Sequence, residues 1–151
     1  MMTTNNKFNI FNQVGNILYG ILPTILFALP LSYFYQIKLI NADMYTIVGG
    51  VIAFIIGSSF TASTLIITMP RENKYLHRLD AKKLIIPYTI VLLLPCLIGI
   101  LSFIMMFLCQ QSDNKPNGII YHMTTLSIYS TFIQFIWSIL VLFMILIRTT
   151  E

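Results

Sequence analysis

Charged side chains are scarce in this sequence. Asp, Glu, Lys and Arg make up 9% of the 151 residues, against about 25% in typical soluble domains. Hydrophobic residues make up 57%, and the mean hydropathy is +0.82. So little charge does not cover the surface of a soluble globule, which excludes a soluble enzyme domain, a nucleic-acid-binding domain and a disordered chain. The composition therefore indicates an integral membrane protein.

Four long stretches contain no charged residue at all. They hold 30, 27, 29 and 32 residues and lie between Lys7 and Lys38, Asp43 and Arg71, Lys83 and Asp113, and Lys115 and Arg148. A bilayer core about 30 Å thick needs about 20 apolar helical residues, so each stretch suffices for one span. We predict an all-α, polytopic membrane protein with one membrane domain over residues 1–151. Its four-transmembrane-helix bundle has spans near 15–37, 45–69, 84–109 and 122–147.

The absence of Asp, Glu, Lys and Arg from these spans narrows the function. Such groups within a bilayer mark proton relays, ion sites and voltage sensors. Their absence argues against a pump, a proton-coupled transporter and a voltage sensor. Small multidrug-resistance transporters also have four helices, but they carry an essential Glu in the first span, which 15–37 lacks.

Side chains for catalysis or metal binding are also few. The predicted topology places the two histidines, His77 and His122, on opposite sides of the membrane. Cys96 and Cys109 lie thirteen residues apart on one predicted helix, about 20 Å along its axis, which is too far for a disulfide. We interpret both as small buried hydrophobes. We therefore expect a non-enzymatic protein without catalytic residues, cofactor or metal.

Positive charge is distributed unevenly and predicts the orientation. Both predicted termini and the segment 70–83 share one side of the membrane, and Lys and Arg concentrate on the cytoplasmic side of membrane proteins. That side holds seven of the nine basic residues: Lys7, Arg71, Lys74, Arg78, Lys82, Lys83 and Arg148. We predict a multi-pass protein of a bacterial inner membrane with both termini cytoplasmic.

The second predicted span carries small residues at every fourth position: Gly49, Ala53, Gly57 and Thr61. Such ridges let helix backbones approach closely in lipid. The ridge either packs against other helices of the same chain or forms the interface of a homo-oligomer. The pattern alone does not separate these interpretations, and we carry the homo-oligomer forward as an expectation.

Polar groups inside the spans are mostly hydroxyls. Six of them gather in the inner half of the second span: Ser58, Ser59, Thr61, Ser63, Thr64 and Thr68. Ser and Thr can bond back to their own helix, or such a cluster can line a hydrated pore. Gln134 is the strongly polar group of the last span. We expect it to face protein, either the hydroxyls of 45–69 or another copy, for about 1 kcal/mol.

The segment 70–83 concentrates the basic residues Arg71, Lys74, Arg78, Lys82 and Lys83. One interpretation is an anchor on anionic lipid headgroups, at about 1 kcal/mol per basic residue. The other is a docking site for an acidic cytoplasmic protein.

These features together favour a non-enzymatic membrane anchor or sensor subunit that docks a cytoplasmic partner through 70–83. Membrane components of bacterial antiviral (phage) defence and toxin-immunity proteins have this general shape, which is an analogy of architecture alone. The alternative is a small oligomeric channel or facilitator, in which the hydroxyls of 45–69 and Gln134 line a path. A lipid-modifying enzyme ranks third, because no base is paired with a nucleophile.

Overall fold

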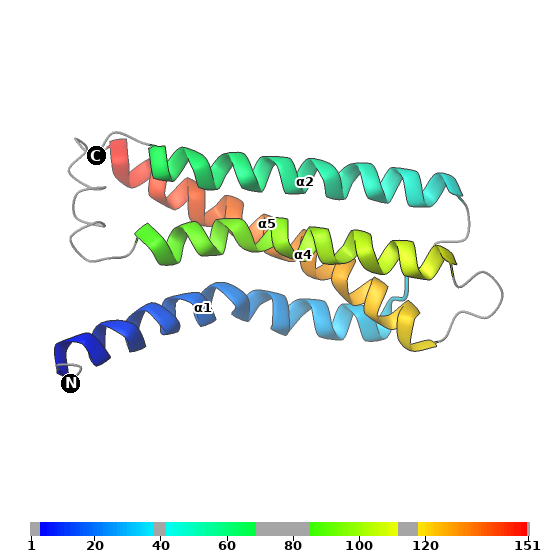
Figure 1. The fold of residues 1–151 in the computed structure, drawn as a ribbon, viewed down its shortest axis with the longest axis horizontal. Coiled ribbons are helices and arrows are strands. Elements are labelled where there is room, and N and C mark those ends of the chain that lie inside the picture. The colour runs from blue at the N-terminus through cyan, green and yellow to red at the C-terminus, as the bar shows by residue number, and fades with distance from the viewer. Residues whose placement is uncertain (1–3, 38–41, 69–84, 112–117, 151) are drawn as a thin grey trace.

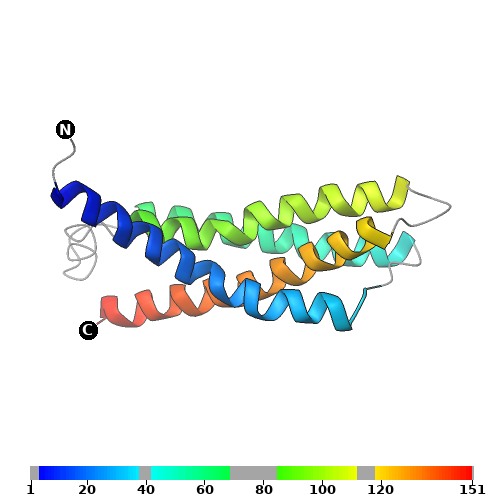
Figure 2. The same ribbon diagram turned by 90° about the horizontal axis from the view of Figure 1, so that it is seen from below.

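The computed structural model describes residues 4–37, 42–68, 85–111 and 118–150, and these residues form four helices. The helices are α1 (Thr4–Phe34), α2 (Ala42–Thr68), α4 (Ile85–Gln111) and α5 (Gly118–Thr150). They run alternately up and down, so that the two chain ends lie at the same end of the molecule (Figure 1). The end of α2 and the start of α4 lie there too, and Figure 2 shows the same arrangement from below.

The all-helical prediction is confirmed, and three helices have the length and apolarity of a membrane span. These stretches are Asp43–Thr68, Ile85–Gln111 and Gly118–Ile147. They match the predicted spans 45–69, 84–109 and 122–147 to within a few residues. In α1 the apolar stretch Gly20–Phe34 is shorter, although the helix itself has 31 residues.

The helices α4 and α5 form the centre of the fold. Each packs against the other and against both α1 and α2, whereas α1 and α2 do not contact each other within the described residues. In Figure 1, α1 and α2 accordingly lie on opposite sides of α4.

Burial in this fold differs from that in a soluble protein. The buried positions include many hydroxyl residues and Gln134, while large apolar side chains such as Leu26, Phe54 and Phe143 are 58%, 68% and 62% exposed. Soluble domains keep contiguous apolar surface small, but in a bilayer the lipid is as apolar as leucine, and polar groups gain by facing one another. The exposed apolar surface therefore fits a lipid environment.

The core is layered along the helix axes. One apolar cluster contains Ile52, Met106 and Ile128. The other contains Ile66, Val91, Leu92, Val141 and Ile145. Between these positions, α2 places the buried Ser59 and Ser63, α4 places Gly99 and Ser102, and α5 places Thr131, Gln134 and Ser138. A layer of small and polar residues thus separates two apolar layers.

Buried residues follow α4 along its length, and the helix packs against three neighbours. Six of them follow one another in steps of three and four: Leu92, Pro95, Gly99, Ser102, Met106 and Cys109. Such a repeat keeps one seam of a helix against its neighbours, and the buried Val91 and Cys96 widen the contact surface beyond that seam. Both cysteines are buried and unbridged, which confirms their interpretation as small buried hydrophobes.

Candidate functional site

The side-chain amide of Gln134 is fully buried, and both its oxygen and its nitrogen form hydrogen bonds to α1. The Thr24 hydroxyl of α1 donates a hydrogen bond to Gln134 Oε1. Gln134 Nε2 donates in turn to the Gly20 carbonyl oxygen at 3.1 Å. A backbone carbonyl only accepts, so this bond fixes which end of the amide faces Gly20. Gln134 thus faces protein, but its partners lie on α1 and not on the hydroxyl surface of α2.

The partner helix α1 is shaped for this contact by Gly20 and Pro23. Proline has no backbone N–H and loosens the helical turn that precedes it, and Gly20 lies within that turn. Figure 1 shows that α1 is bent. A Cβ at Gly20 would collide with the side chain of Val91 in α4, so the glycine allows α1 to approach α4 while its carbonyl binds Gln134.

The small-residue stripe of α1 was not predicted from the sequence. Gly20, Thr24, Ala28 and Ser32 recur every four residues, and all four are buried. They form the same type of ridge that we predicted for the second span. The four-residue spacing carries the signal of this stripe, but Pro23 and Pro30 interrupt the stretch and make it a less obvious contact face.

A second polar contact joins α4 to α5. The hydroxyls of Ser102 and Thr131 lie 2.9 Å apart, and each also bonds to its own helix, Ser102 to the Ile98 carbonyl at 3.0 Å and Thr131 to the Ser127 carbonyl at 2.8 Å. Each hydroxyl has one proton, so one of the two donates to the other, which in turn donates to its own helix carbonyl, and both donors are satisfied inside the core. Two buried hydroxyls, Ser59 Oγ and Thr125 Oγ1, have no hydrogen-bond partner among the described residues.

The hydroxyls of α2 largely bond back to their own helix, as expected for hydroxyls in lipid. Ser58 donates to the Ile55 carbonyl at 3.0 Å, Thr61 to the Gly57 carbonyl at 2.9 Å, and Ser63 to the Phe60 carbonyl at 2.8 Å. Thr64 and Thr68 do the same. The back-bonding interpretation is confirmed for these five residues, and Ser59 is the exception.

The predicted small-residue ridge of α2 is buried at its first residue and exposed at the other three. Gly49 is buried, and a Cβ there would lie 3.4 Å from the Phe103 ring. Ala53, Gly57 and Thr61 are exposed, and a Cβ at Gly57 would meet nothing within 4 Å. These three residues therefore do not pack within the described part of the chain. Gly99 in α4 provides the close approach to α2, since a Cβ there would lie 2.8 Å from Ile56 Cγ1.

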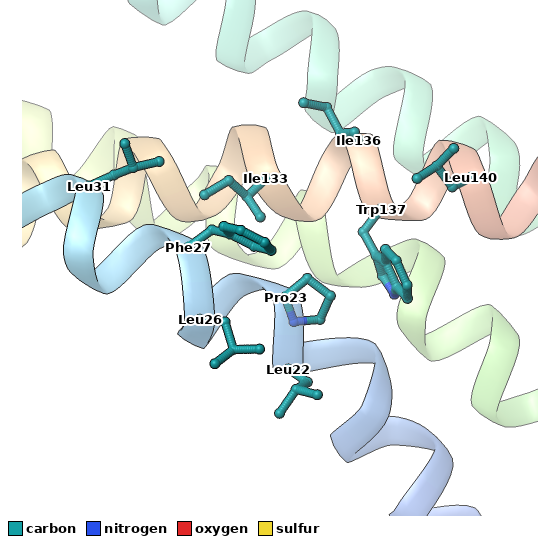
Figure 3. A pocket seen from close by; sticks show the side chains of 9 residues that line it. All are labelled: Leu22, Pro23, Leu26, Phe27, Leu31, Ile133, Ile136, Trp137 and Leu140. Atoms are coloured by element: carbon teal, nitrogen blue, oxygen red, sulfur yellow. The ribbon is translucent and has the colours of Figure 1, made fainter.

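A groove of about 460 Å³ runs between α1 and α5 (Figure 3). All of its lining side chains are apolar: Leu22, Pro23, Leu26, Phe27, Leu31, Ile133, Ile136, Trp137 and Leu140. Trp137 extends from α5 beside Pro23, while Phe27 lies next to Ile133 (Figure 3). A smaller cavity of about 150 Å³ is lined by residues of α1, α4 and α5, among them Gly20, Tyr88 and Met144. Trp137 lines both this cavity and the groove.

The predicted docking residues Arg71, Lys74, Arg78, Lys82 and Lys83 lie outside the described residues, as does His77. His122 is exposed, and Gln36 Nε2 lies 3.0 Å from its Nε2 atom. Among the residues that the structure describes, no three His, Cys, Asp or Glu side chains are grouped to hold a metal ion. Comparison with protein-family models, curated proteins and solved structures found no match.

Proposed function

We propose that this protein is a non-enzymatic membrane anchor or sensor subunit that docks a cytoplasmic partner through residues 70–83. The observation that carries the proposal is the convergence of chain ends. The start of α1, the end of α2, the start of α4 and the end of α5 all lie at one end of the molecule (Figure 1). The sequence attached to that end contains seven of the nine basic residues, so a negatively charged protein would approach from that side.

The apolar exterior supports the anchoring part of the proposal. Large apolar side chains are exposed on all four described helices, so each helix presents a face suited to lipid. Gln134 and many hydroxyl residues lie in the interior, where Gln134 and Ser102 have protein partners. A bundle with this apolar surface is more stable in the bilayer than in water.

We infer that α1 forms the fourth span. It packs against both α5 and α4, and the chain beyond it reaches the start of α5, where Gln36 contacts His122. Its beginning lies at the same end of the molecule as the end of α5 (Figures 1 and 2). A helix that accompanies a membrane-spanning helix over its length crosses the same bilayer. Both termini then lie on the basic side, which the distribution of Lys and Arg marks as cytoplasmic.

The channel alternative rests on a different observation. Thr61 and Thr68 are exposed on α2, so an oligomer that brings α2 helices together would gather these hydroxyls. Gln134 does not belong to such a path, because both ends of its amide bind α1. We therefore rank the channel second, with the exposed threonines of α2 as its lining.

Recruitment of soluble proteins to membranes tests the docking proposal. The full chain, inserted in membranes of its own host, is compared with the triple variant Lys74→Gln, Arg78→Gln, Lys82→Gln. We expect the triple variant to lose the bound soluble partner, because complementary charge steers such encounters. The matched control is Lys7→Gln with Arg148→Gln, which removes charge from the same end but outside 70–83. Equal recruitment by wild type and triple variant would refute docking, and conduction lost in Thr61→Leu would favour the channel.

A further inference from the structure

We propose that the groove between α1 and α5 binds one acyl chain of a membrane lipid. The proposal rests on the membrane location in the proposed function and is independent of docking through 70–83. The groove volume of about 460 Å³ falls within the range of small-molecule sites, about 300–1,000 Å³. Its chemistry, depth and shape each point to a hydrocarbon occupant.

The chemistry of the lining favours a hydrocarbon ligand. Leucine, isoleucine, phenylalanine, proline and tryptophan side chains make up the walls. Among these side chains, the indole N–H of Trp137 is the one hydrogen-bond donor, and none is an acceptor. A ligand with several polar atoms would therefore lose its hydration and gain few partners in the groove.

The depth of the groove matches the hydrocarbon core. Ile133, which lines the groove, lies at the middle of the 30-residue apolar stretch Gly118–Ile147 of α5, and Trp137 lies about one helical turn further on. Both positions therefore fall within a bilayer core about 30 Å thick that is centred on this stretch. Leu26, Phe27 and Ile136 are 58%, 59% and 59% exposed, so the groove opens sideways to lipid. At that depth the surrounding medium consists of acyl chains.

The shape of the groove favours an acyl chain over a helix of a second copy. Close helix packing in lipid depends on Gly, Ala, Ser and Thr, which let backbones approach. The groove has none of these in its lining. Small exposed residues occur instead on α2, at Ala53 and Gly57, on the side of α4 away from α1 (Figure 1). A second copy would therefore pack on α2, and the groove stays open to lipid.

Trp137 provides the test, because it is the sole tryptophan of the chain and lines the groove. The full protein is placed in phosphatidylcholine vesicles at high lipid-to-protein ratio, with increasing fractions of lipid brominated in the middle of the chain. Bromine quenches indole fluorescence on contact. We expect quenching that rises linearly with the brominated fraction, as for a site that holds one chain, and that is weaker for lipid brominated near the headgroup.

Variants that narrow the mouth of the groove give the second arm. Ile136→Phe and Leu140→Phe add bulk at exposed rim positions, so neither threatens the fold. We expect each to reduce quenching of Trp137 by about half or more, while Leu97→Phe, an equally exposed position on α4, leaves it unchanged.

Several results would overturn the groove proposal. Absent quenching, or quenching unchanged in both rim variants, would remove the site. If quenching rises steeply at a low brominated fraction, the indole of Trp137 contacts many acyl chains at once, and the groove does not hold a single chain. Quenching that increases as the protein is diluted in lipid would show that a second copy fills the groove. Failure of the protein to float with the vesicles would instead refute the membrane location, and with it both proposals.

Discussion

The side-chain amide of Gln134 in α5 donates a hydrogen bond of 3.1 Å to the backbone carbonyl of Gly20 in α1. The two residues are 114 positions apart in the sequence, and the bond lies in the polar layer between the two apolar clusters. It joins the first described helix of the chain to the last. Pro23 and the close approach of Gly20 to Val91 lie in the same part of α1 as this bond.

Replacing Gln134 by leucine should destabilise the fold by about 1 kcal/mol, the usual size of a hydrogen bond between membrane helices. The change leaves the Thr24 hydroxyl without its acceptor on α5. Thermal unfolding of the protein in detergent, followed by circular dichroism, measures the effect. The matched control is Gln110→Leu, since Gln110 is exposed at the end of α4. Equal unfolding midpoints for the two variants would refute a structural role for the Gln134 contacts.

Replacing Gly20 by alanine should destabilise the fold by about 1–3 kcal/mol, the typical cost of overfilling a packed site. The added methyl group would collide with Val91. The second change Val91→Ala should restore part of the stability in the double variant. Gly15→Ala is the control, because a Cβ there meets nothing within 4 Å, and alanine should stabilise the helix by roughly 0.5–1 kcal/mol. If Gly20→Ala also raises the stability of the fold, the close contact between Gly20 and Val91 is refuted.

Replacing Gly57 by leucine should leave the unfolding midpoint of the single chain almost unchanged, because Gly57 faces outward. Gly99→Leu should lower that midpoint markedly, since the new side chain must displace Ile56. If the α2 ridge joins copies, Gly57→Leu should abolish the oligomer seen by cross-linking in membranes. A monomeric wild type, with Gly57→Leu indistinguishable from it, would remove the interface prediction.

Reporter fusions should place the end of the chain in the cytoplasm and residues 112–117 outside. Basic residues are retained on the cytoplasmic side of a membrane, and seven of nine lie on the side of the termini. An alkaline phosphatase fused after Glu151 should be inactive, whereas one inserted within 112–117 should be active. A cytoplasmic signal from 112–117 would refute the model with four spans.

The hydrophobic pattern was sufficient to predict three of the four described helices to within a few residues, because each of their uncharged stretches is longer than the roughly 20 residues that a span needs. The first helix begins at Thr4, well before the predicted span 15–37. The pattern was not sufficient to predict which faces meet. The Ala53, Gly57 and Thr61 positions have the residue types of a contact face and are exposed. The equivalent pattern at Gly20, Thr24, Ala28 and Ser32 is buried. Both stripes obey the same local rule, and helix order around α4 decides which one has a neighbour.

The sequence by itself determined the class of this protein: helical, strongly apolar, and without Asp, Glu, Lys or Arg in the middle of its apolar stretches. Those properties follow from composition and spacing, which need no knowledge of neighbours. Tertiary structure alone decided that Gln134 binds α1, that Gly20 and Gly99 set the close approaches, and that α1 and α5 leave an apolar groove beside Trp137. Each of these depends on residues far apart in the chain, whose contact is settled only when the helices have packed.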